Sequence, residues 1–376
     1  MTEIFLIRHI QAEGNLYRMM QGQWDGGVTR LGLMQRDALA ERFRTEKLDA
    51  VVSSDLYRAL VTASGAAQYH PGLEIIKSKA FRELNVGPLE KRFFGDILYR
   101  EPENMRLFMY DSEKWSYDGA ETFPEAGARA LEELKRVISE RPGQRIAVVS
   151  HGVTLRSMLS LITGVPLSDT EHLPICGNAS VTKLNYSDGE FSIEYFNDMS
   201  HLGTMPRWNG AVPSLRAERL SPVADAVRYC ECYKDAWMAA HGNLKGFYAD
   251  TYLMSVTSRC RADADGVLKL FDGDTPAGII EMDTLRGADS GIGWIAFLYL
   301  SPEYRGRGLG IQLLARAIMH YRELGRSVIC LNVAESNAPA RAFYKKWGFT
   351  ETSYTKGAAG RLIVMERSLD TKSTAL

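Results

Sequence analysis

The chain has 376 residues, which is long for one hydrophobic core, because a domain usually holds about 100–200 residues. Its composition, 45% hydrophobic and 24% charged, is that of an ordinary globular protein, and no apolar run approaches the ~20 residues of a membrane helix. A formal net charge of -1 gives no bulk electrostatic reason to expect nucleic acid or a membrane as a partner.

The first half of the chain alternates strand-like and helix-like segments. Short apolar runs predict strands at 3–7, 49–53 and 145–150. Amphipathic periodicity predicts helices at 31–43, with Thr29 as the N-cap, and at 55–69, 125–140 and 153–163. This alternation is typical of a mainly parallel α/β sheet.

A stretch at 201–215 separates this half from a second α/β pattern. It contains Gly, Pro and Asn without periodicity, which is typical of a linker. We therefore expect a first domain at 1–203, a linker at 204–215 and a second domain at 216–376. In the second domain we predict helices at 222–240, 243–255, 308–324 and 338–347, and strands at 267–271, 276–282, 293–300, 327–333 and 361–366.

Three predicted strands of the first domain end in chemically capable side chains. The first delivers Arg8 and His9, the second leads through Ser54 to Arg58, and the third delivers His151. Ligands of open α/β sheets gather beyond the carboxyl ends of strands. Two histidines at such ends, each with an arginine, therefore favour a site over a purely structural role.

The chemistry that fits these residue types is attack on phosphorus. A phosphomonoester is a dianion, and guanidinium groups supply both positive charge and paired donors. A neutral imidazole is a competent nucleophile, and flanking arginines disfavour its protonation. A second histidine stabilises charge on the transferring group, and a carboxylic acid must protonate the leaving oxygen. No metal is expected.

These residues also carry a family resemblance. Segments 6–15 (LIRHIQAEGN), 53–63 (SSDLYRALVTA), 82–90 (RELNVGPLE) and 150–154 (SHGVT) resemble motifs of the histidine phosphatase (phosphoglycerate mutase-like) superfamily. The resemblance covers residues 3 to about 200 and implies a three-layer α/β/α fold. It implies His9 as the phosphorylated nucleophile, Arg8, Arg58 and His151 as phosphate ligands, Asn15 as a further donor to the substrate and Glu83 as the proton donor.

Two positions depart from the pattern of that superfamily. Ile10 stands where the family has glycine after the first histidine, and Lys91 stands where glycine usually follows the acid segment. Glycine allows close backbone approach and positive φ, which a β-branched residue resists. Ile10 therefore leaves open a non-catalytic sensor of a phosphorylated ligand. A phosphoglycerate-type mutase is a second alternative, although release to water fits the short 84–150 segment better.

The second domain contains a glycine-rich turn between a predicted strand and a helix. The turn is Arg305-Gly306-Arg307-Gly308-Leu309-Gly310, and such a turn can cradle a diphosphate with its N–H groups. A dinucleotide-binding motif should lie in the first βα unit and be followed by an acidic residue, and neither condition is met. The Gly-Lys-Ser/Thr ending of a nucleoside-triphosphate loop is absent from the sequence.

Together with the segment 331–349 (LNVAESNAPARAFYKKWGF), this turn resembles the GNAT superfamily of N-acetyltransferases over about 216–368. The resemblance implies a mixed-sheet α/β fold and acetyl-CoA as co-substrate. It implies backbone pairing of the pantetheine arm near 297–300, which includes Leu298 and Leu300, and diphosphate binding by 305–310. It also places Asn337 beside the cofactor and makes Tyr344 the acid for the departing thiolate. Glu281 and Asp283 are the candidates for the base that deprotonates the amine.

The sequence as a whole predicts a bifunctional enzyme. We expect a histidine acid phosphatase-type phosphomonoesterase joined to an N-acetyltransferase that acts on an amine of a small molecule. Five cysteines form no metal or disulfide pattern, and the N-terminus lacks a basic leader, so we expect a cytoplasmic location. A homodimer is compatible with these features, which do not fix the oligomeric state.

Overall fold

The computed structural model describes residues 1–206 and 212–370. Within these ranges the chain divides into two compact units, one of residues 1–93 and 100–206 and one of residues 94–99 and 212–370. The segment 207–211, which falls in the predicted linker, lies outside the described residues. The end of that predicted linker is in contact with the second unit, where Gln312 donates to the carbonyl of Pro213 and accepts the N–H of Leu215.

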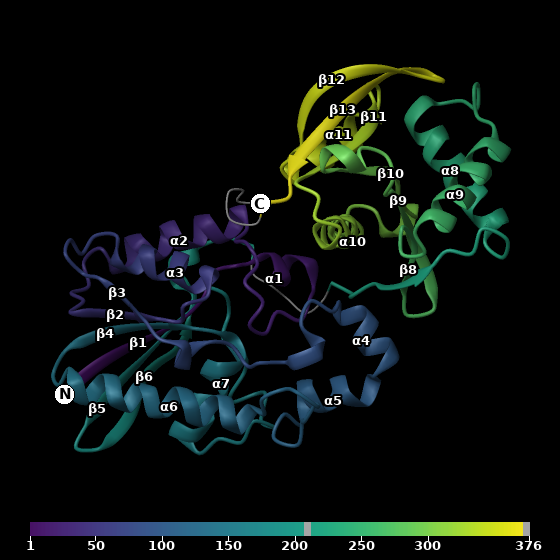
Figure 1. The fold of residues 1–376 in the computed structure, drawn as a ribbon. Coiled ribbons are helices and arrows are strands. Elements are labelled where there is room, and N and C mark those ends of the chain that lie inside the picture. Colours follow the sequence, from purple (N-terminus) through teal and green to yellow (C-terminus); the bar gives the residue numbers. More distant parts are fainter. Residues whose placement is uncertain (207–211, 371–376) are drawn as a thin grey trace. The chain divides into compact units, whose positions relative to one another are not determined.

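The first unit contains a six-stranded sheet in the order β3-β2-β4-β1-β5-β6 (Figure 1). Its strands are β1 (Thr2–Arg8), β2 (Ala50–Ser53), β3 (Ile75–Lys77), β4 (Arg145–Ser150), β5 (Val181–Ser187) and β6 (Glu190–Asp198). β3, β2, β4 and β1 are parallel, whereas β5 and β6 are antiparallel to their neighbours. The sheet is therefore mainly parallel, as predicted, with an antiparallel hairpin at one edge.

Helices cover both faces of this sheet, which gives the expected three layers. The helices of this unit are α1 (Glu13–Tyr17), α2 (Arg30–Phe43), α3 (Tyr57–Ala67), α5 (Pro102–Tyr110), α6 (Phe123–Glu140) and α7 (Gly152–Thr163), with single 3₁₀ turns at Lys79–Phe81, Gly87–Leu89 and Ser200–Leu202. The pairs α2–α3 and α6–α7 are the ones that pack together in layers. The hydroxyl of Thr29 accepts the N–H of Gly32 at 3.0 Å, so the predicted cap of α2 is confirmed.

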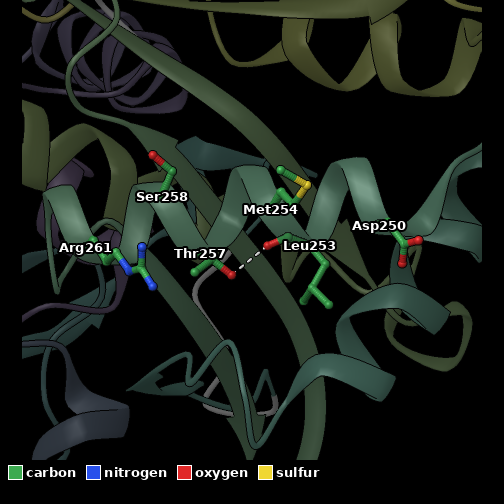
Figure 2. Close-up of a pocket in the computed structure, with 6 residues that line it drawn as sticks. All are labelled: Asp250, Leu253, Met254, Thr257, Ser258 and Arg261. Atoms are coloured by element: carbon green, nitrogen blue, oxygen red, sulfur yellow. Dashed lines mark hydrogen bonds between the residues drawn. The ribbon is translucent and has the colours of Figure 1, made fainter.

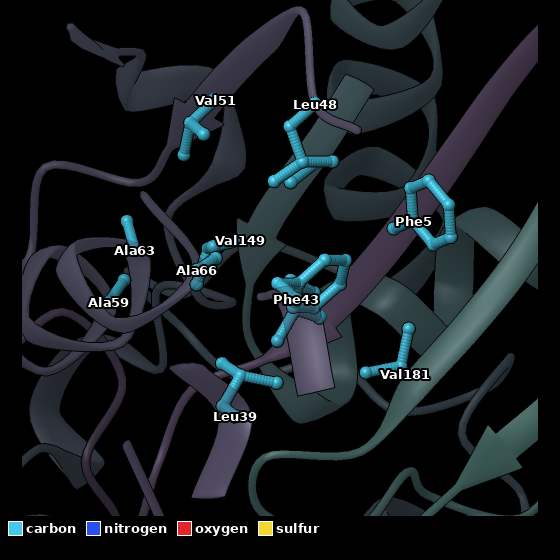
Figure 3. Packing of buried hydrophobic residues seen from close by; sticks show 12 residues of the cluster. Phe5, Leu39, Phe43, Leu48, Val51, Ala59, Ala63, Ala66, Val149 and Val181 are labelled. Atoms are coloured by element: carbon cyan, nitrogen blue, oxygen red, sulfur yellow. The ribbon is translucent and has the colours of Figure 1, made fainter. Parts of the chain in front are cut away.

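The core between the sheet and helices α2 and α3 fixes the strand ends (Figure 3). Phe5 of β1 meets Phe43 of α2 edge to face, with ring centroids 5.4 Å apart. Small residues of α3, among them Ala59 and Ala63, let that helix lie close to Val51 of β2. The central strands are buried on both faces, as parallel strands usually are.

The second unit contains a seven-stranded mixed sheet in the order β12-β13-β11-β10-β9-β8-β7. Its strands are β7 (Arg216–Arg219), β8 (Val267–Asp272), β9 (Thr275–Asp283), β10 (Ile292–Leu300), β11 (Val328–Ala334), β12 (Thr350–Gly357) and β13 (Gly360–Ser368). Its helices are α8 (Ala226–His241), α9 (Ala249–Ala262), α10 (Gly310–Glu323) and α11 (Ala338–Lys346), with 3₁₀ turns at Ala288–Ser290 and Pro302–Tyr304. The short helix α4 (Phe94–Arg100) belongs to this unit except for its last residue.

The strands β10 and β11 are parallel neighbours, but they are hydrogen-bonded to each other only along the first part of their length. Ile292–Ile295 pair with Val328–Leu331, after which the described pairing of each strand continues only with its outer neighbour. The register of β10 against β9 shifts between Ile295 and Phe297, which is a β-bulge. The strands therefore open a gap in the sheet, flanked by unpaired backbone.

Across residues 1–206 and 212–370, no helix combines the length and the apolar character needed to traverse a bilayer.

Candidate active sites

In the first unit, the predicted side chains meet at the carboxyl ends of adjacent strands. β2, β4 and β1 are neighbours in the sheet and end at Ser53, Ser150 and Arg8. His9 and His151 follow two of these strands directly, and their ring centroids are 5.1 Å apart. The chain therefore brings both histidines to one point of the sheet, where the strand order places a ligand site.

His9 is buried, with 2% of its surface exposed. One hydrogen bond shows which of its ring nitrogens carries the hydrogen. Its Nδ1 lies 2.6 Å from the carbonyl oxygen of Ile10. Because a carbonyl only accepts, Nδ1 carries the hydrogen and Nε2 keeps a lone pair. Burial lowers the pKa of His9 well below its usual value, and the charges of Arg58 and Arg8 lower it further. The imidazole is therefore neutral near neutral pH, with its lone pair on Nε2.

Two guanidinium groups flank this ring. Arg58 is fully buried and donates from Nη1 to the carbonyl of Trp24 and from Nη2 to the carbonyl of Gly22, both at 2.8 Å. Arg8 donates to the carbonyl of Cys176, and its buried Nε has no partner within the described residues. Each guanidinium has five N–H groups, so both arginines retain donors for an anion.

Burial also acts on the pKa of these two arginines. It lowers the pKa of Arg8 and Arg58, to about 10 for Arg58, while the nearby carboxylate of Glu83 acts in the opposite direction. Both groups therefore stay charged at neutral pH. The site combines two cations, two neutral imidazoles and one carboxylate, which suits a phosphate dianion.

His151 is held by two hydrogen bonds inside the protein. Arg58 donates from Nε to Nδ1 of His151 at 3.2 Å, so the hydrogen of the neutral ring lies on Nε2, which is 2.8 Å from the hydroxyl of Ser54. Burial lowers the pKa of His151 well below its usual value, and Arg58 lowers it further. To bind a phosphate oxygen, Nε2–H must exchange Ser54 for that oxygen.

Glu83 lies at the N-terminus of α7, next to His151. Its carboxylate accepts the N–H of Val153 at 3.2 Å and the N–H and hydroxyl of Thr154 at 2.9 and 3.0 Å. A carboxylate at a helix N-terminus is stabilised by those N–H groups and by the helix dipole. The predicted proton donor is thus anchored in the site, where its charge acts on both arginines.

Asn178 connects the predicted Asn15 to His9. Oδ1 of Asn15 accepts the N–H of Ala12 at 3.0 Å and lies 3.4 Å from the amide nitrogen of Asn178. That same amide donates to the carbonyl of His9 at 3.0 Å. Asn178 precedes β5 in a loop without periodicity or a recognised motif, so no sequence pattern pointed to it.

The two departures from the family pattern have different consequences. Ile10 is fully buried and packs in a cluster with Val28, Ala179 and Leu202, and its backbone is outside the left-handed region. Lys91 does adopt the left-handed conformation, with φ at 64°. Glycine is therefore structurally favoured at 91, whereas the side chain of residue 10 belongs to the core.

In the second unit, the gap between β10 and β11 opens into a cavity of about 360 Å³. α8, α9, α11 and the β12–β13 hairpin complete its walls. Leu298, Asn337 and Tyr344 of the predicted site all line it. Leu300 and the 305–310 turn are outside this lining, and the carbonyl of Leu300 accepts from Arg305 at 2.7 Å.

The 305–310 turn has the backbone expected of an anion cradle. Gly306 and Gly308 have φ of 73° and 76°, and a side chain would be strained at either position. Their N–H groups lie just before α10, which begins at Gly310. Arg305 pairs with Asp235 at 2.6 Å, and Arg307 lies over the ring of Tyr304.

Tyr344 is buried, and burial raises the pKa of its phenol well above the usual value. A phenol with a raised pKa stays protonated at neutral pH, which suits a proton donor to a thiolate. Asn337 caps α11, its Oδ1 accepting the N–H of Ala340 at 3.2 Å. Both side chains therefore face the same cavity from α11.

The expected base candidates lie outside the lining of this cavity. Glu281 is fully buried, accepts the hydroxyl of Tyr229 at 2.8 Å and pairs with Arg259. Burial raises the pKa of Glu281, whereas Arg259 and Tyr229 lower it. Asp283 also pairs with Arg259, at 3.3 Å. Among the described residues that line the cavity, the only imidazole is that of His241, which the sequence did not single out.

A second hollow of the same unit, about 500 Å³, lies along α9 (Figure 2). All six lining side chains come from that one helix: Asp250, Leu253, Met254, Thr257, Ser258 and Arg261. The hydroxyl of Thr257 is bonded to the carbonyl of Leu253 within the helix. No second element contributes a facing group to this lining, so the hollow is not a candidate active site.

Comparisons with known proteins identify a family for each part of the chain. Residues 4–199 match the family model of the histidine phosphatase superfamily (branch 1), and residues 228–349 match that of the acetyltransferase (GNAT) family. A probable phosphoglycerate mutase GpmB of Enterobacter sp. (strain 638) is 30% identical over 207 residues, which cover 54% of this chain and 95% of that protein. A metal-independent phosphoserine phosphatase of Arabidopsis thaliana is 32% identical over 54% of this chain and 84% of its own. The solved structure of Bacillus stearothermophilus YhfR matches with a TM-score of 0.52 and 26% identity, over 54% of this chain and all of that one.

Proposed function

Because this chain belongs to the histidine phosphatase superfamily and carries a GNAT acetyltransferase domain, we propose that it is a bifunctional enzyme. One site hydrolyses a phosphomonoester through a phosphohistidine, and the other transfers an acetyl group from acetyl-CoA to an amine. The first assignment rests on the Nε2 lone pair of His9, which is flanked by Arg8 and Arg58. The second rests on the cavity that Leu298, Asn337 and Tyr344 share.

The phosphatase reaction follows from the polarity of these groups. Arg8 and Arg58 bind the phosphate oxygens with their remaining N–H groups, and the ring of His9 is oriented by the carbonyl of Ile10. Nε2 attacks phosphorus while the bond to the leaving oxygen breaks, and Glu83, which has taken up a proton from solvent before this step, gives that proton to the leaving oxygen. Water then attacks phosphorus, Glu83 takes a proton back, the P–N bond breaks and phosphate is released.

His151 assists this transfer through its Nε2–H, which turns from Ser54 to a phosphate oxygen. Arg58 fixes the opposite nitrogen and so keeps the hydrogen on Nε2. Donors aimed at developing charge in a site closed to water stabilise the transition state strongly.

The acetyl transfer needs a neutral amine and a protonated leaving thiolate. The amine nitrogen attacks the thioester carbonyl, the C–S bond breaks, and Tyr344 protonates the sulfur. We assign removal of the proton from the amine to His241, because Glu281 and Asp283 are bonded to Arg259 outside the cavity lining. The N–H groups of the 305–310 turn hold the diphosphate of acetyl-CoA.

Trapping of the phosphoenzyme tests the proposed phosphatase activity. The full chain is mixed with p-nitrophenyl phosphate and quenched in base, and acid-labile phosphohistidine is measured. We expect a phosphoenzyme in the wild type and none in His9→Ala, with turnover lower by about 10³-fold or more. His172→Ala, at an exposed histidine, is the matched control and should behave as wild type.

The same assay separates a phosphatase from a phosphoglycerate-type mutase, which the similarity to a probable phosphoglycerate mutase favours. With 3-phosphoglycerate added as an acceptor, a phosphatase releases one phosphate per nitrophenol. A deficit of phosphate, recovered as a bisphosphorylated product, would identify the mutase. A wild type that neither forms phosphohistidine nor turns over would favour a sensor.

Calorimetry with acetyl-CoA tests the proposed acetyltransferase activity. We expect saturable binding by the full chain, weakened by Gly308→Val, because a β-branched residue resists the positive φ of that position. Lack of saturable binding would remove the acetyltransferase assignment.

A further inference from the structure

The cavity of the second unit has an uncharged wall. Among the described residues that line it there is no Asp, Glu, Lys or Arg, and its titratable side chains are three tyrosines and His241. An anion transferred from water into such a pocket loses its hydration without gaining a counter-charge. The wall therefore disfavours any acceptor that carries a phosphate or a carboxylate into the cavity.

An aromatic surface forms the α8–α9 side of this cavity. Tyr233 stacks on Tyr252 at 4.0 Å and on Phe297 at 4.1 Å, and Trp237 lies one helical turn further along α8. Ala236 and Ala240 share this face of α8 and leave space in front of the rings. Aromatic faces attract an ammonium group and pack against another ring.

Two polar atoms interrupt this wall. Nε1 of Trp237 and Oδ1 of Asn332 are buried and have no hydrogen-bond partner within the described residues. Both side chains line the cavity, one from α8 and one from β11. Buried polar atoms are normally paired with protein or water, so the indole N–H is open to an acceptor and the amide oxygen to a donor, from a ligand or from water. An amine donates, and a thioester or amide carbonyl accepts.

On the basis of the proposed acetyltransferase activity, we propose that the acyl acceptor is an amine on an apolar, aromatic-sized body without a phosphate or carboxylate group, the class of the arylalkylamines. Its ring lies against Trp237 and Tyr252, because Tyr252 and Phe297 already cover the two faces of Tyr233. Its amino group reaches the amide of Asn332, and the uncharged wall favours loss of the ammonium proton before attack on the thioester.

This assignment orders the two reactions. The first site binds phosphate between two guanidinium groups, whereas the described lining of the second cavity offers no cation to an anion. If one compound is processed at both sites, dephosphorylation must therefore precede acetylation. A phosphorylated amine would be a substrate of the first site only.

An amine panel with the full chain tests the acceptor class. With saturating acetyl-CoA, thiol release is followed for 2-phenylethylamine, for phenylalanine, which adds a carboxylate, and for 2-aminoethylphosphonate, which the phosphatase site cannot hydrolyse. We expect kcat/KM for 2-phenylethylamine to exceed the other two by about tenfold or more, since burial of an unpaired anion is strongly unfavourable. Equal or faster acetylation of either anionic amine, or no turnover of any of the three by protein that binds acetyl-CoA, would overturn the proposal. Lack of acetyl-CoA binding would instead overturn the proposed function itself.

Two variants at one position test the aromatic wall. Trp237→Leu removes the ring and should raise KM for 2-phenylethylamine roughly 3–30-fold. Trp237→Phe keeps a ring and should stay within about threefold of wild type. Acetyl-CoA affinity should be unchanged in both, which also shows that the unit is folded. A loss of acetyl-CoA affinity equal to the loss for the amine would place Trp237 in the coenzyme site and contradict the proposal.

Discussion

The hydrogen bond from Nδ1 of His9 to the carbonyl oxygen of Ile10, 2.6 Å long, uses only the main chain of residue 10. The side chain of Ile10 points away into a cluster that includes Val28 and Leu202. The bond that orients the imidazole of His9 is therefore independent of the residue type at 10. Packing of the first unit, in contrast, depends on that side chain.

Substitution of Ile10 should separate these two effects. Ile10→Gly empties a buried site and should lower the free energy of unfolding by about 3–5 kcal/mol, whereas Ile10→Val should lower it by about 1 kcal/mol. Phosphatase turnover at 15 °C, measured on folded protein, should stay within about threefold of wild type in both variants. An inactive wild type together with an active Ile10→Gly variant would contradict this expectation and support the sensor alternative.

Because His9 and His151 are buried, we expect the free energy of unfolding to fall in acid. Their folded-state pKa values lie well below the ordinary value of 6.5, since burial and Arg58 disfavour the charged form. Below pH 6.5 the unfolded chain therefore binds protons that the folded protein does not. The free energy of unfolding is fully retained above that pH. It should fall by about 2.7 kcal/mol per pH unit as the pH drops towards the lowered values.

Urea unfolding at pH 7.5, 6.5 and 5.5 measures this slope. His151→Asn keeps an acceptor for Arg58 and His9→Asn keeps a donor for Ile10, and each should reduce the slope by about 1.4 kcal/mol per pH unit. His172→Asn, at an exposed histidine, should leave it unchanged. An unchanged slope in the first two variants would show that neither ring is neutral in the folded state.

Lys91 is the departure from the family pattern that affects the backbone. Its φ of 64° is unfavourable for a residue with a side chain, while its N–H is bonded to the carbonyl of Met20 at 2.8 Å. Lys91→Gly should raise the free energy of unfolding by about 0.5–1 kcal/mol, whereas Lys91→Ala should not. Denaturant midpoints of the two variants provide the measurement, and a gain for alanine equal to that for glycine would exclude backbone strain as the cause.

The central strands of the first unit could be predicted from sequence because burial on both faces makes them continuous apolar runs. The β5–β6 hairpin was missed, although Asp188 and Gly189 at its turn both have positive φ, as a two-residue hairpin turn requires. The edge strand β12 was missed because its side chains are mostly exposed and carry no periodic apolar pattern. Its pairing with β13 is a tertiary contact that composition does not encode.

The candidate residues that the structure brings together could be predicted where they follow strands in recognisable motifs. Asn178, which joins His9 to Asn15, comes from an irregular loop and has no such signal. The face of α8 that carries Tyr233 and Trp237 has the spacing of an ordinary core stripe, so its sequence does not distinguish a cavity wall from packing. Whether this face of α8 lines a cavity or packs in a core depends on where β10 and β11 separate, which is a feature of the tertiary structure.

Substitution of Tyr344 should lower the rate of acetyl transfer without weakening the binding of acetyl-CoA. Burial raises the pKa of its phenol, so the group stays protonated throughout the neutral range. Tyr344→Phe removes the donor and should lower kcat for acetyl transfer by about 10²-fold or more. Calorimetry should give an unchanged acetyl-CoA affinity. A proportional loss of affinity would make Tyr344 a binding residue instead.

The choice between His241 and Glu281 as the group that deprotonates the amine predicts opposite results for two isosteric variants. His241→Gln should lower kcat by about 10²-fold, because an amide is not basic enough to take the proton of the amine. Glu281→Gln should keep most of the activity. It should instead lower the thermal midpoint, because its neutral amide no longer pairs with Arg259. Turnover per folded molecule decides between them, with acetyl-CoA affinity as the check that each variant is folded. A loss of turnover in Glu281→Gln that His241→Gln does not show would identify Glu281 as the base.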